Sequence, residues 1–263
     1  MSKRLGGSLP FIRVPLCFSD SGMTSTLSST SLPDPPQHSE ITQGRTGHAA
    51  IDALRITEIF FSLQGETSRI GLPTVFVRLT GCPLRCGYCD TEYAFHGGRR
   101  ASVDGILADV GSFGASYVTV TGGEPLAQRG CLSLLGKLCD AGYSVSLETS
   151  GAMDISKVDS RVSRIMDIKT PASGEVEKNL WTNVSCLAGR DEVKFVLSDE
   201  ADYQWAVEVL HKHRLNLLCP VLFSPVHGKL DAAILGNWIL RDRLPVRMQI
   251  QLHKILWGEG PGR

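Results

Sequence analysis

The chain has 263 residues with a formal net charge of zero, and 42% of its residues are hydrophobic. That is enough apolar material for one full-sized domain. The charge balance excludes a protein that grips nucleic-acid phosphates, and no apolar run is long enough to span a membrane, so a small-molecule substrate is favoured over nucleic acid or membrane.

The eight cysteines lack the dense, even spacing of a secreted disulfide scaffold. Three lie close together, at positions 82, 86 and 89, and five are scattered, at 17, 131, 139, 186 and 219. We therefore expect a reducing compartment, the cytoplasm.

The first 50 residues are rich in Ser, Thr, Pro and Gly and have no sustained apolar period. This composition is typical of a disordered segment. We predict a disordered extension over residues 1–50 and one domain over 51–263. Because Lys3, Arg4 and Arg13 precede any acidic residue, a transit peptide or an extended start codon stays open as an alternative.

Alternating apolar residues over 54–61 and 74–80 predict two strands that frame a polar loop. Further along, strands and helices alternate, which implies right-handed crossovers and a mostly parallel sheet. We predict an α/β fold with a full or partial (β/α) barrel. Its helices are expected near 103–110, 127–140, 200–213 and 231–241, and its later strands near 117–121, 144–148, 164–168, 192–197, 217–223 and 246–252.

The three clustered cysteines, Cys82, Cys86 and Cys89, lie within eight residues. The Gly and Pro residues among them disfavour both helix and strand, so a loop is predicted. Soft thiolates select iron–sulfur clusters, Zn or Cu(I). Structural Zn usually takes four protein ligands, and no second pair of ligands follows here. A four-iron cluster on three thiolates keeps one iron open for a small molecule; the alternative is a Zn site with His96 as fourth ligand.

Polar clusters follow four predicted strands, at residues 121–125, 148–151, 167–171 and 223–226. In parallel barrels the chemistry gathers at the C-terminal ends of the strands. We therefore expect these clusters to share one site at the barrel mouth.

The spacing Cys-x3-Cys-x2-Cys, with Tyr88 before the last cysteine, resembles the signature of the radical S-adenosylmethionine (SAM) enzymes. Residues 122–125 resemble their Gly-Gly-Glu-Pro motif, although alone this run would be an ordinary strand-to-helix turn. The resemblance implies a 4Fe–4S cluster on the three cysteines, with SAM bound to the open iron.

A more specific resemblance is carried by Leu63-Gln-Gly-Glu66, Arg78, Cys89-Asp-Thr91 and Gln251-Leu-His-Lys254. Together they resemble the 7-carboxy-7-deazaguanine synthases, radical SAM lyases of the deazapurine pathway to queuosine. The resemblance spans residues 54–257. It implies 6-carboxy-5,6,7,8-tetrahydropterin as substrate, a 4Fe–4S cluster, SAM and Mg²⁺ as cofactors, an electron donor such as flavodoxin or ferredoxin, and a homodimer.

Carried over by position, the resemblance implies sites for substrate, SAM and metals, and it marks no obligatory general base. The substrate residues are Leu63, Gln64, Gly65, Glu66, Arg78, Thr121 and His253. The SAM residues are Tyr88, Cys89, Asp90, Gly122, Gly123, Glu124, Glu148, Ser150, Asp167, Ile168, Lys169, Phe223, Ser224, Pro225 and Val226. Iron would be held by Cys82, Cys86 and Cys89, and Mg²⁺ by Thr91, because hard cations prefer oxygen.

Alternatives stand beside these roles. Arg78 suits a substrate carboxylate but could serve an ordinary carboxylate partner, and His253 could be a structural histidine on a strand. Ser150 could be a helix cap rather than a SAM contact. Asp167 and Lys169 could form a surface ion pair worth little.

Two rival classes remain. A glycyl-radical activase would share the cluster and the Gly-Gly-Glu-Pro motif, but it would not need the motifs at 63–66, Arg78 and 251–254. A structural Zn-binding module is the second rival class. The chain also departs from the family pattern in its long N-terminus, its loop over 92–100 and the residues that follow Lys254.

Overall fold

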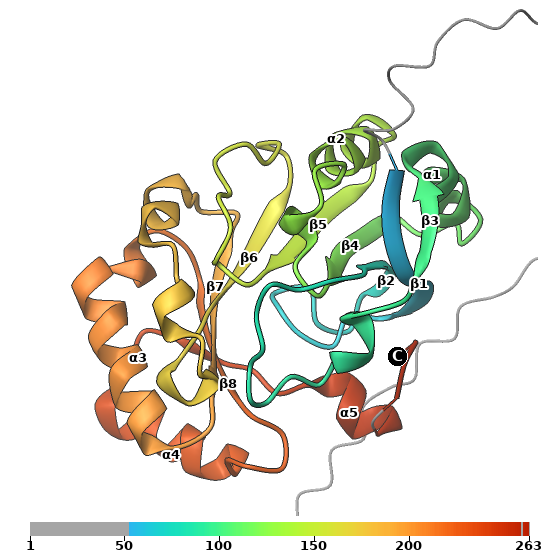
Figure 1. The fold of residues 1–263 in the computed structure, drawn as a ribbon. Coiled ribbons are helices and arrows are strands. Elements are labelled where there is room, and N and C mark those ends of the chain that lie inside the picture. Colours follow the sequence, from blue (N-terminus) through green and yellow to red (C-terminus); the bar gives the residue numbers. More distant parts are fainter. Residues whose placement is uncertain (1–52, 259, 263) are drawn as a thin grey trace, which may run out of the picture. The chain divides into compact units, whose positions relative to one another are not determined.

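The computed structural model describes residues 53–258 and 260–262; the predicted disordered extension over 1–50 lies outside them. The described residues form a nine-stranded sheet in the order β3-β1-β2-β4-β5-β6-β7-β8-β9, which does not close (Figure 1). β1 pairs antiparallel with β2 and β3, and every pairing from β2 onward to β9 is parallel. The predicted α/β fold is therefore confirmed, in its partial-barrel form.

The strands are β1 (Ala53–Leu63), β2 (Pro73–Leu79), β3 (Arg99–Ser102), β4 (Tyr117–Gly122), β5 (Ser144–Thr149), β6 (Ser163–Ile168), β7 (Glu192–Leu197), β8 (Val221–Pro225) and β9 (Arg247–Met248). The α-helices are α1 (Val103–Gly111), α2 (Cys131–Asp140), α3 (Glu200–His213), α4 (Ala232–Asp242) and α5 (Leu252–Trp257). Short 3₁₀ helices cover Glu92–Ala94, Pro125–Ala127, Pro171–Ser173, Val176–Lys178, Trp181–Cys186 and Leu215–Leu217.

Three helices begin at side chains that cap a free backbone N–H. Ser102 accepts from the amide of Gly105, and Asp199 and Asp231 do the same for α3 and α4. The packed side of the sheet is a continuous apolar core that includes Leu134, Phe195 and other fully buried side chains. This packing holds the strands rigidly, which fixes where their C-terminal ends lie.

Most predicted elements are confirmed with shifted ends. The helix predicted from 127 begins at Cys131, because Pro125–Ala127 forms a separate 3₁₀ turn. The strand predicted over 217–223 lies at Val221–Pro225, because a 3₁₀ helix and Pro220 occupy its start. β3 was not predicted, because its residues Arg99–Ser102 show no apolar alternation.

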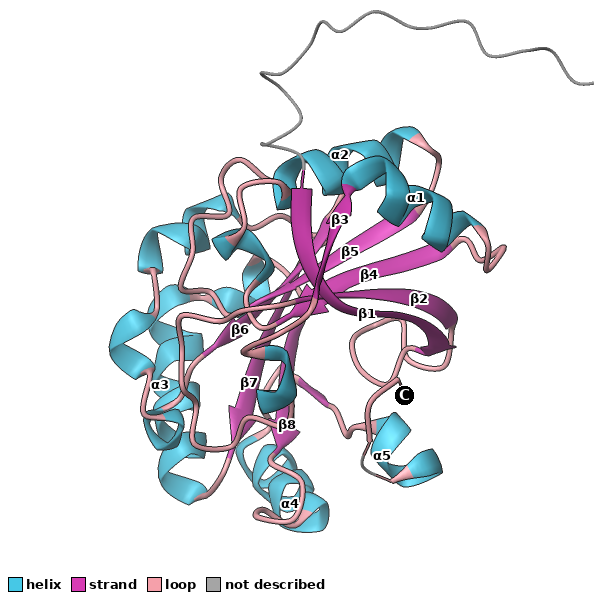
Figure 2. Ribbon diagram, turned by 45° about the vertical axis from the view of Figure 1, so that its right-hand side comes forward, coloured by secondary structure: helices cyan, strands magenta, loops and turns pink. Residues whose placement is uncertain are grey.

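The strand predicted over 246–252 is confirmed only at Arg247–Met248, which form β9, and a helix begins at Leu252. β9 has two residues, and its last contact with the sheet is the Gln249 amide bonded to the Phe223 carbonyl at 2.9 Å. The chain then leaves this edge, and the Leu252 amide bonds the Gly65 carbonyl at 3.0 Å. α5 therefore lies beside the turn between β1 and β2, apart from α1–α4 (Figure 2).

Two further features complete the fold. On α4, Ile239 is buried and Trp238 packs on the core, whereas Ile234 is exposed. Within the described residues no helix is long and apolar enough to cross a membrane.

Candidate active site

A cavity of about 720 Å³ opens where the parallel strands end, facing the cysteine loop and α5. It is lined by most of the predicted site residues: Leu63, Gln64, Gly65, Glu66, Arg78, Cys82, Cys86, Tyr88, Cys89, Asp90, Thr91, Thr121, Gly122, Gly123, Glu148, Ser150, Asp167, Lys169, Val226 and His253. Residues far apart in the chain thus meet at one opening. The predicted residues Glu124, Ile168, Phe223, Ser224 and Pro225 do not line it.

The three clustered thiols line this cavity and are each about half buried. Burial raises the pKa of all three thiols, to about 11 for Cys86, although the positive charge of Lys169 acts in the opposite direction. Burial also raises the pKa of the neighbouring Tyr88 to about 12. The thiols are therefore protonated in the metal-free protein, and ligation would displace their protons.

Gly122 and Gly123 let the end of β4 press against the cysteine loop. A Cβ on Gly123 would lie 2.2 Å from the Gly81 carbonyl oxygen and 2.8 Å from the Cβ of Cys82. Gly122 has φ +139°, and its Cβ would lie 2.1 Å from the Leu79 carbonyl oxygen. Gly123 thus sets the distance between the end of β4 and the cysteine loop, and Gly122 sets the distance between β4 and the end of β2.

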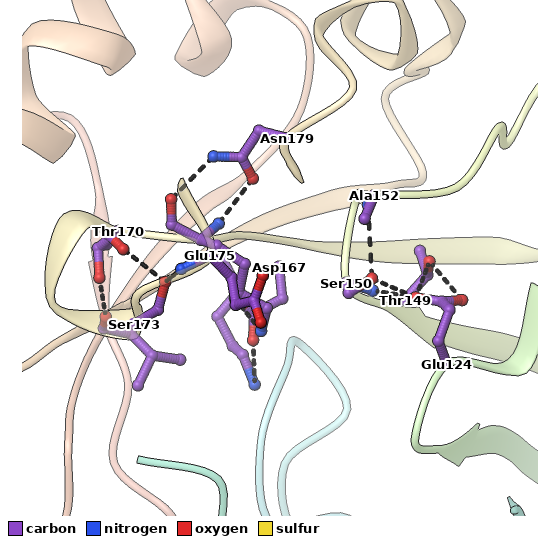
Figure 3. Close-up of polar contacts among 12 residues, drawn as sticks. Glu124, Thr149, Ser150, Ala152, Asp167, Thr170, Ser173, Glu175 and Asn179 are labelled. Carbon is purple, nitrogen blue, oxygen red and sulfur yellow. Dashed lines mark hydrogen bonds and ion pairs between the residues drawn. The ribbon is translucent and has the colours of Figure 1, made fainter. Parts of the chain in front are cut away.

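Glu124 lies wholly inside the protein and holds the end of β5 in place (Figure 3). Its carboxylate accepts from the Thr149 hydroxyl at 3.0 Å, from the Ser150 amide at 2.7 Å, and from the Ser150 hydroxyl. It also accepts from the Leu126 amide at 3.0 Å. With its oxygens engaged, Glu124 positions Ser150 at the cavity wall instead of facing the cavity.

The end of β5 also decides the alternative role for Ser150. No helix follows this strand, so the prediction of a helix cap is wrong; the hydroxyl accepts from the Ala152 amide at 3.4 Å within a turn.

A row of alternating charges crosses the cavity, and we call it the charge row: Glu66, Lys194, Asp167 and Lys169. The Lys194 ammonium lies 2.7 Å from Glu66 Oε2 and 3.7 Å from Asp167 Oδ2, and Lys169 lies 3.1 Å from Asp167 Oδ1. The side chains of Asp167 and Lys169 are 17% and 11% exposed, so the surface-pair alternative is wrong. The Asn179 side chain, labelled in Figure 3, bonds both backbone groups of Lys169 at 2.9 and 2.8 Å.

Glu148 lies with predicted substrate residues. It accepts from the Thr121 hydroxyl at 2.8 Å and from the Gln64 amide at 3.4 Å. Burial raises its pKa, and Lys194 offsets this only in part. Burial acts the same way on Glu66, but there Lys194 and a hydrogen bond from Gln251 outweigh it and hold the pKa below its usual value.

Arg78 is paired, as the alternative prediction proposed, and it still faces the cavity. Its Nε donates to Glu58 at 2.7 Å, and the Tyr93 hydroxyl donates to the same oxygen at 2.8 Å. The guanidinium lies over the rings of Phe60 and Tyr93, with centroids at 5.5 and 5.8 Å. Among the described residues only Nε of Arg78 makes a hydrogen bond or ion pair, so its terminal nitrogens can bind a carboxylate ligand.

Gln251 and the start of α5 line the cavity and contact two loops. Gln251 donates to Glu66 at 2.9 Å and to Asp90 at 3.2 Å, and Lys254 pairs with Asp90 at 2.8 Å. His253 therefore lies on a helix, not on the predicted strand. Its ring packs against Gly65, where a Cβ would come within 2.1 Å of Nδ1.

Comparison with known proteins decides between the remaining classes. A model of the radical SAM superfamily matches residues 76–214. The chain is 48% identical over 207 residues to a 7-carboxy-7-deazaguanine synthase of Chlorobaculum tepidum, covering 78% of this chain and 94% of the relative. A synthase of Koribacter versatilis is 44% identical, with 78% and 97% covered. The chain belongs to the 7-carboxy-7-deazaguanine synthase family.

A solved structure shares the fold of this synthase family member. The crystal structure of QueE from Escherichia coli superposes with a TM-score of 0.65 at 22% identity, covering 80% of this chain and 100% of that chain. Membership of the radical SAM family implies a 4Fe–4S cluster and SAM as cofactors.

The site of this family member fits a cluster better than a single metal ion. In the described part of the chain, no three His, Cys, Asp or Glu side chains are arranged to hold one ion. His96 contacts Phe95 and does not line the cavity, so the Zn alternative gains no support. Cysteines of a 4Fe–4S cluster ligate separate irons, and the three thiols on one cavity wall suit that arrangement.

Sequence reasoning missed Lys194, Glu58 and Tyr93. Lys194 stands in a strand whose polar and apolar residues alternate, and Glu58 stands in a similar one, so both looked like solvent-facing positions. A signal was available for Glu58, because it and Arg78 place opposite charges in the two predicted strands that frame one loop.

Proposed function

We propose that the protein is a 7-carboxy-7-deazaguanine synthase, a carbon–nitrogen lyase that converts 6-carboxy-5,6,7,8-tetrahydropterin to 7-carboxy-7-deazaguanine with loss of ammonia. The product would enter 7-deazapurine biosynthesis, as in the queuosine pathway. One observation carries the proposal: all segments with the family resemblance line one cavity, in a chain similar to synthases over most of its length.

Cys82, Cys86 and Cys89 would hold the cluster, and SAM would lie between the cysteine loop and the strand ends at Gly123, Ser150, Lys169 and Val226. When bound, these cofactors would supply the radical that takes hydrogen from C6 of the pterin. The protein's part is to position the substrate and the cofactors and to exclude water from the cavity. Lys169, held beside Asp167, would face the SAM carboxylate.

The substrate would occupy the side of the cavity nearer β1, β2 and α5. Arg78 would hold its carboxylate, steadied by Glu58. Glu66 and Glu148 would accept from the N–H groups of the pterin ring. We assign Glu148 to the substrate and not to the SAM ribose, because it bonds Thr121 and Gln64.

Mg²⁺ would bind at Thr91, whose hydroxyl lies 3.0 Å from Asp90 Oδ1 at the cavity wall. Oxygen ligands of this kind suit a hard cation. Thr91→Ala should weaken the dependence of turnover on Mg²⁺ while leaving SAM cleavage intact; unchanged Mg²⁺ dependence would contradict the assignment.

Further proposals concern partners and compartment. We infer a flavodoxin- or ferredoxin-like electron donor and a homodimer, both from the family resemblance. We also infer work in the cytoplasm, a reducing compartment with which the free state of every described cysteine agrees. Sedimentation equilibrium checks the dimer, and a monomer at micromolar concentration would contradict it.

The test of the function is anaerobic reconstitution with iron and sulfide, followed by incubation with SAM, dithionite, Mg²⁺ and the carboxytetrahydropterin. Mass spectrometry should find 7-carboxy-7-deazaguanine. Cys86→Ala should abolish both SAM cleavage and product, whereas Cys139→Ala, on α2 outside the cavity, should retain both. SAM cleavage without deazapurine would favour another radical SAM activity, such as a glycyl-radical activase.

A further inference from the structure

Lys194 belongs to no motif of the sequence, yet it stands between two predicted sites. On β7 it is the register partner of Asp167 on β6, so both side chains emerge on the same face of the sheet. Its ammonium also reaches Glu66, which follows β1 128 residues earlier in the chain. A single strand-borne cation thus contacts one carboxylate of the substrate segment and one of the SAM segment.

These three groups are largely shielded from water. The side chains of Lys194, Glu66 and Asp167 are 14%, 13% and 17% exposed. Among the described residues, Lys194 makes the only ion pair of Glu66. Asp167 has a second cation in Lys169, so the two carboxylates depend on Lys194 to different degrees.

The charges facing this cluster extend the same pattern. Glu148 acts on Lys194 electrostatically, and Gln251 donates to the Glu66 oxygen that Lys194 leaves free. Without the Lys194 charge, Glu66 and Glu148 would be neighbouring carboxylates of like sign in a poorly solvated cavity, which is unfavourable for both. Glu66 would then turn away from the position in which a substrate could use it.

We propose that Lys194 is a positioning residue that couples the substrate site to the cofactor site, by orienting Glu66 toward the pterin and Asp167 beneath SAM. The inference rests on the proposed function, since it takes Glu66 as a substrate contact and Asp167 as part of the SAM site. Its consequence is that substrate binding and productive use of the radical depend on the same ammonium group.

The experiment compares Lys194→Met, Lys194→Gln and Lys194→Arg with the wild type and with Lys157→Met, an exposed lysine outside the cavity. The first readout is equilibrium binding of 6-carboxypterin, a stable relative of the substrate, to protein without cluster. The second is the ratio of 5′-deoxyadenosine to product in reconstituted enzyme. In the proposed reaction 5′-deoxyadenosine would return a hydrogen to the product radical and SAM would be regenerated, so free 5′-deoxyadenosine measures uncoupled cleavage.

Lys194→Met and Lys194→Gln should weaken 6-carboxypterin binding at least tenfold and raise the 5′-deoxyadenosine-to-product ratio at least tenfold. Lys194→Arg should recover much of both, and Lys157→Met should match the wild type. Lys194→Gln keeps hydrogen-bond donors without the charge, so it serves if the methionine variant does not fold. Wild-type values of both readouts in Lys194→Gln would overturn the inference.

The outcomes separate this inference from the proposed function. If the wild type makes the deazapurine and the Lys194 variants stay coupled, the proposed function stands and the proposed role of Lys194 is wrong. If the wild type neither binds 6-carboxypterin nor makes product, both the proposed function and the role of Lys194 are wrong.

Discussion

Lys194 and Lys254 both pair with carboxylates at the same cavity, but different parts of the fold carry them. Lys194 stands on β7, between β6 and β8, and its partner Glu66 is 13% exposed. Lys254 stands on the six-residue α5, in which no whole residue is buried; its own side chain is 9% exposed, but its partner Asp90 is 46% exposed. The strand-borne side of the cavity is therefore built into the core, whereas the α5 side is attached by a few polar contacts.

This difference separates two tasks that one cavity must perform. Reacting groups must be held in one geometry, which a packed sheet provides. Ligands must also enter and leave, and elements of low local stability serve that need. We expect the strand side to fix the chemistry and α5 to close over it.

The largest expected effect tests the strand side. Glu124→Ala removes the acceptor of four donor groups: the buried Thr149 hydroxyl, Ser150 amide and Ser150 hydroxyl, and the part-buried Leu126 amide. Because unsatisfied buried donors are costly, we expect a loss of about 3–5 kcal/mol in the free energy of unfolding. Urea denaturation measures it, with the exposed Glu177→Ala as control. A loss under about 1 kcal/mol would show that water replaces the carboxylate and that this side is not rigid.

The next effect concerns the Lys194–Glu66 pair itself. A double-mutant cycle of Lys194→Met and Glu66→Gln should give a coupling free energy of about 2–3 kcal/mol, because both groups are shielded and removal of either leaves the other unpaired. Urea denaturation of the four proteins gives the value. Additive losses would mean that the pair is solvated in solution.

The sequence could predict the cysteine loop and the strand ends because each carries its own local pattern. The alternation of strands and helices along the chain predicted β4–β7, and the C-terminal ends of these strands lie at the same edge in any parallel sheet. Lys194 could not be found this way. Its role depends on Glu66, a residue 128 positions away, and on the register of β7 with β6.

α5 was missed for a related reason. Residues 246–252 alternate like a strand, but at this edge β9 has one neighbour and loses its pairing after two residues. The contact between Leu252 and Gly65 then favours the helix. Such a contact between distant segments leaves no local pattern in the sequence.

Deleting α5 is the third test. A chain ended after Gln251 loses the Leu252–Gly65 hydrogen bond and the Lys254–Asp90 pair, in which the Lys254 side chain is 9% exposed, but no apolar core residue. We expect it to lose about 1–2 kcal/mol of stability, while 6-carboxypterin binding weakens about tenfold. A chain ended after Trp257 keeps α5 and serves as control. A much larger loss of stability would place α5 in the core and remove the contrast between the two sides.

The smallest effect is expected for Lys254→Met. Asp90 is nearly half exposed, so solvent screens its pair with Lys254, and Gln251 still donates to the same carboxylate oxygen. The loss of stability should stay below about 1 kcal/mol and shrink further in 1 M salt, where the Debye length falls to about 3 Å. Thermal unfolding of both proteins at low and high salt measures this. A salt-independent loss comparable to that of the Lys194 variants would mean that α5 holds Asp90 as tightly as β7 holds Glu66, because only a shielded pair resists screening.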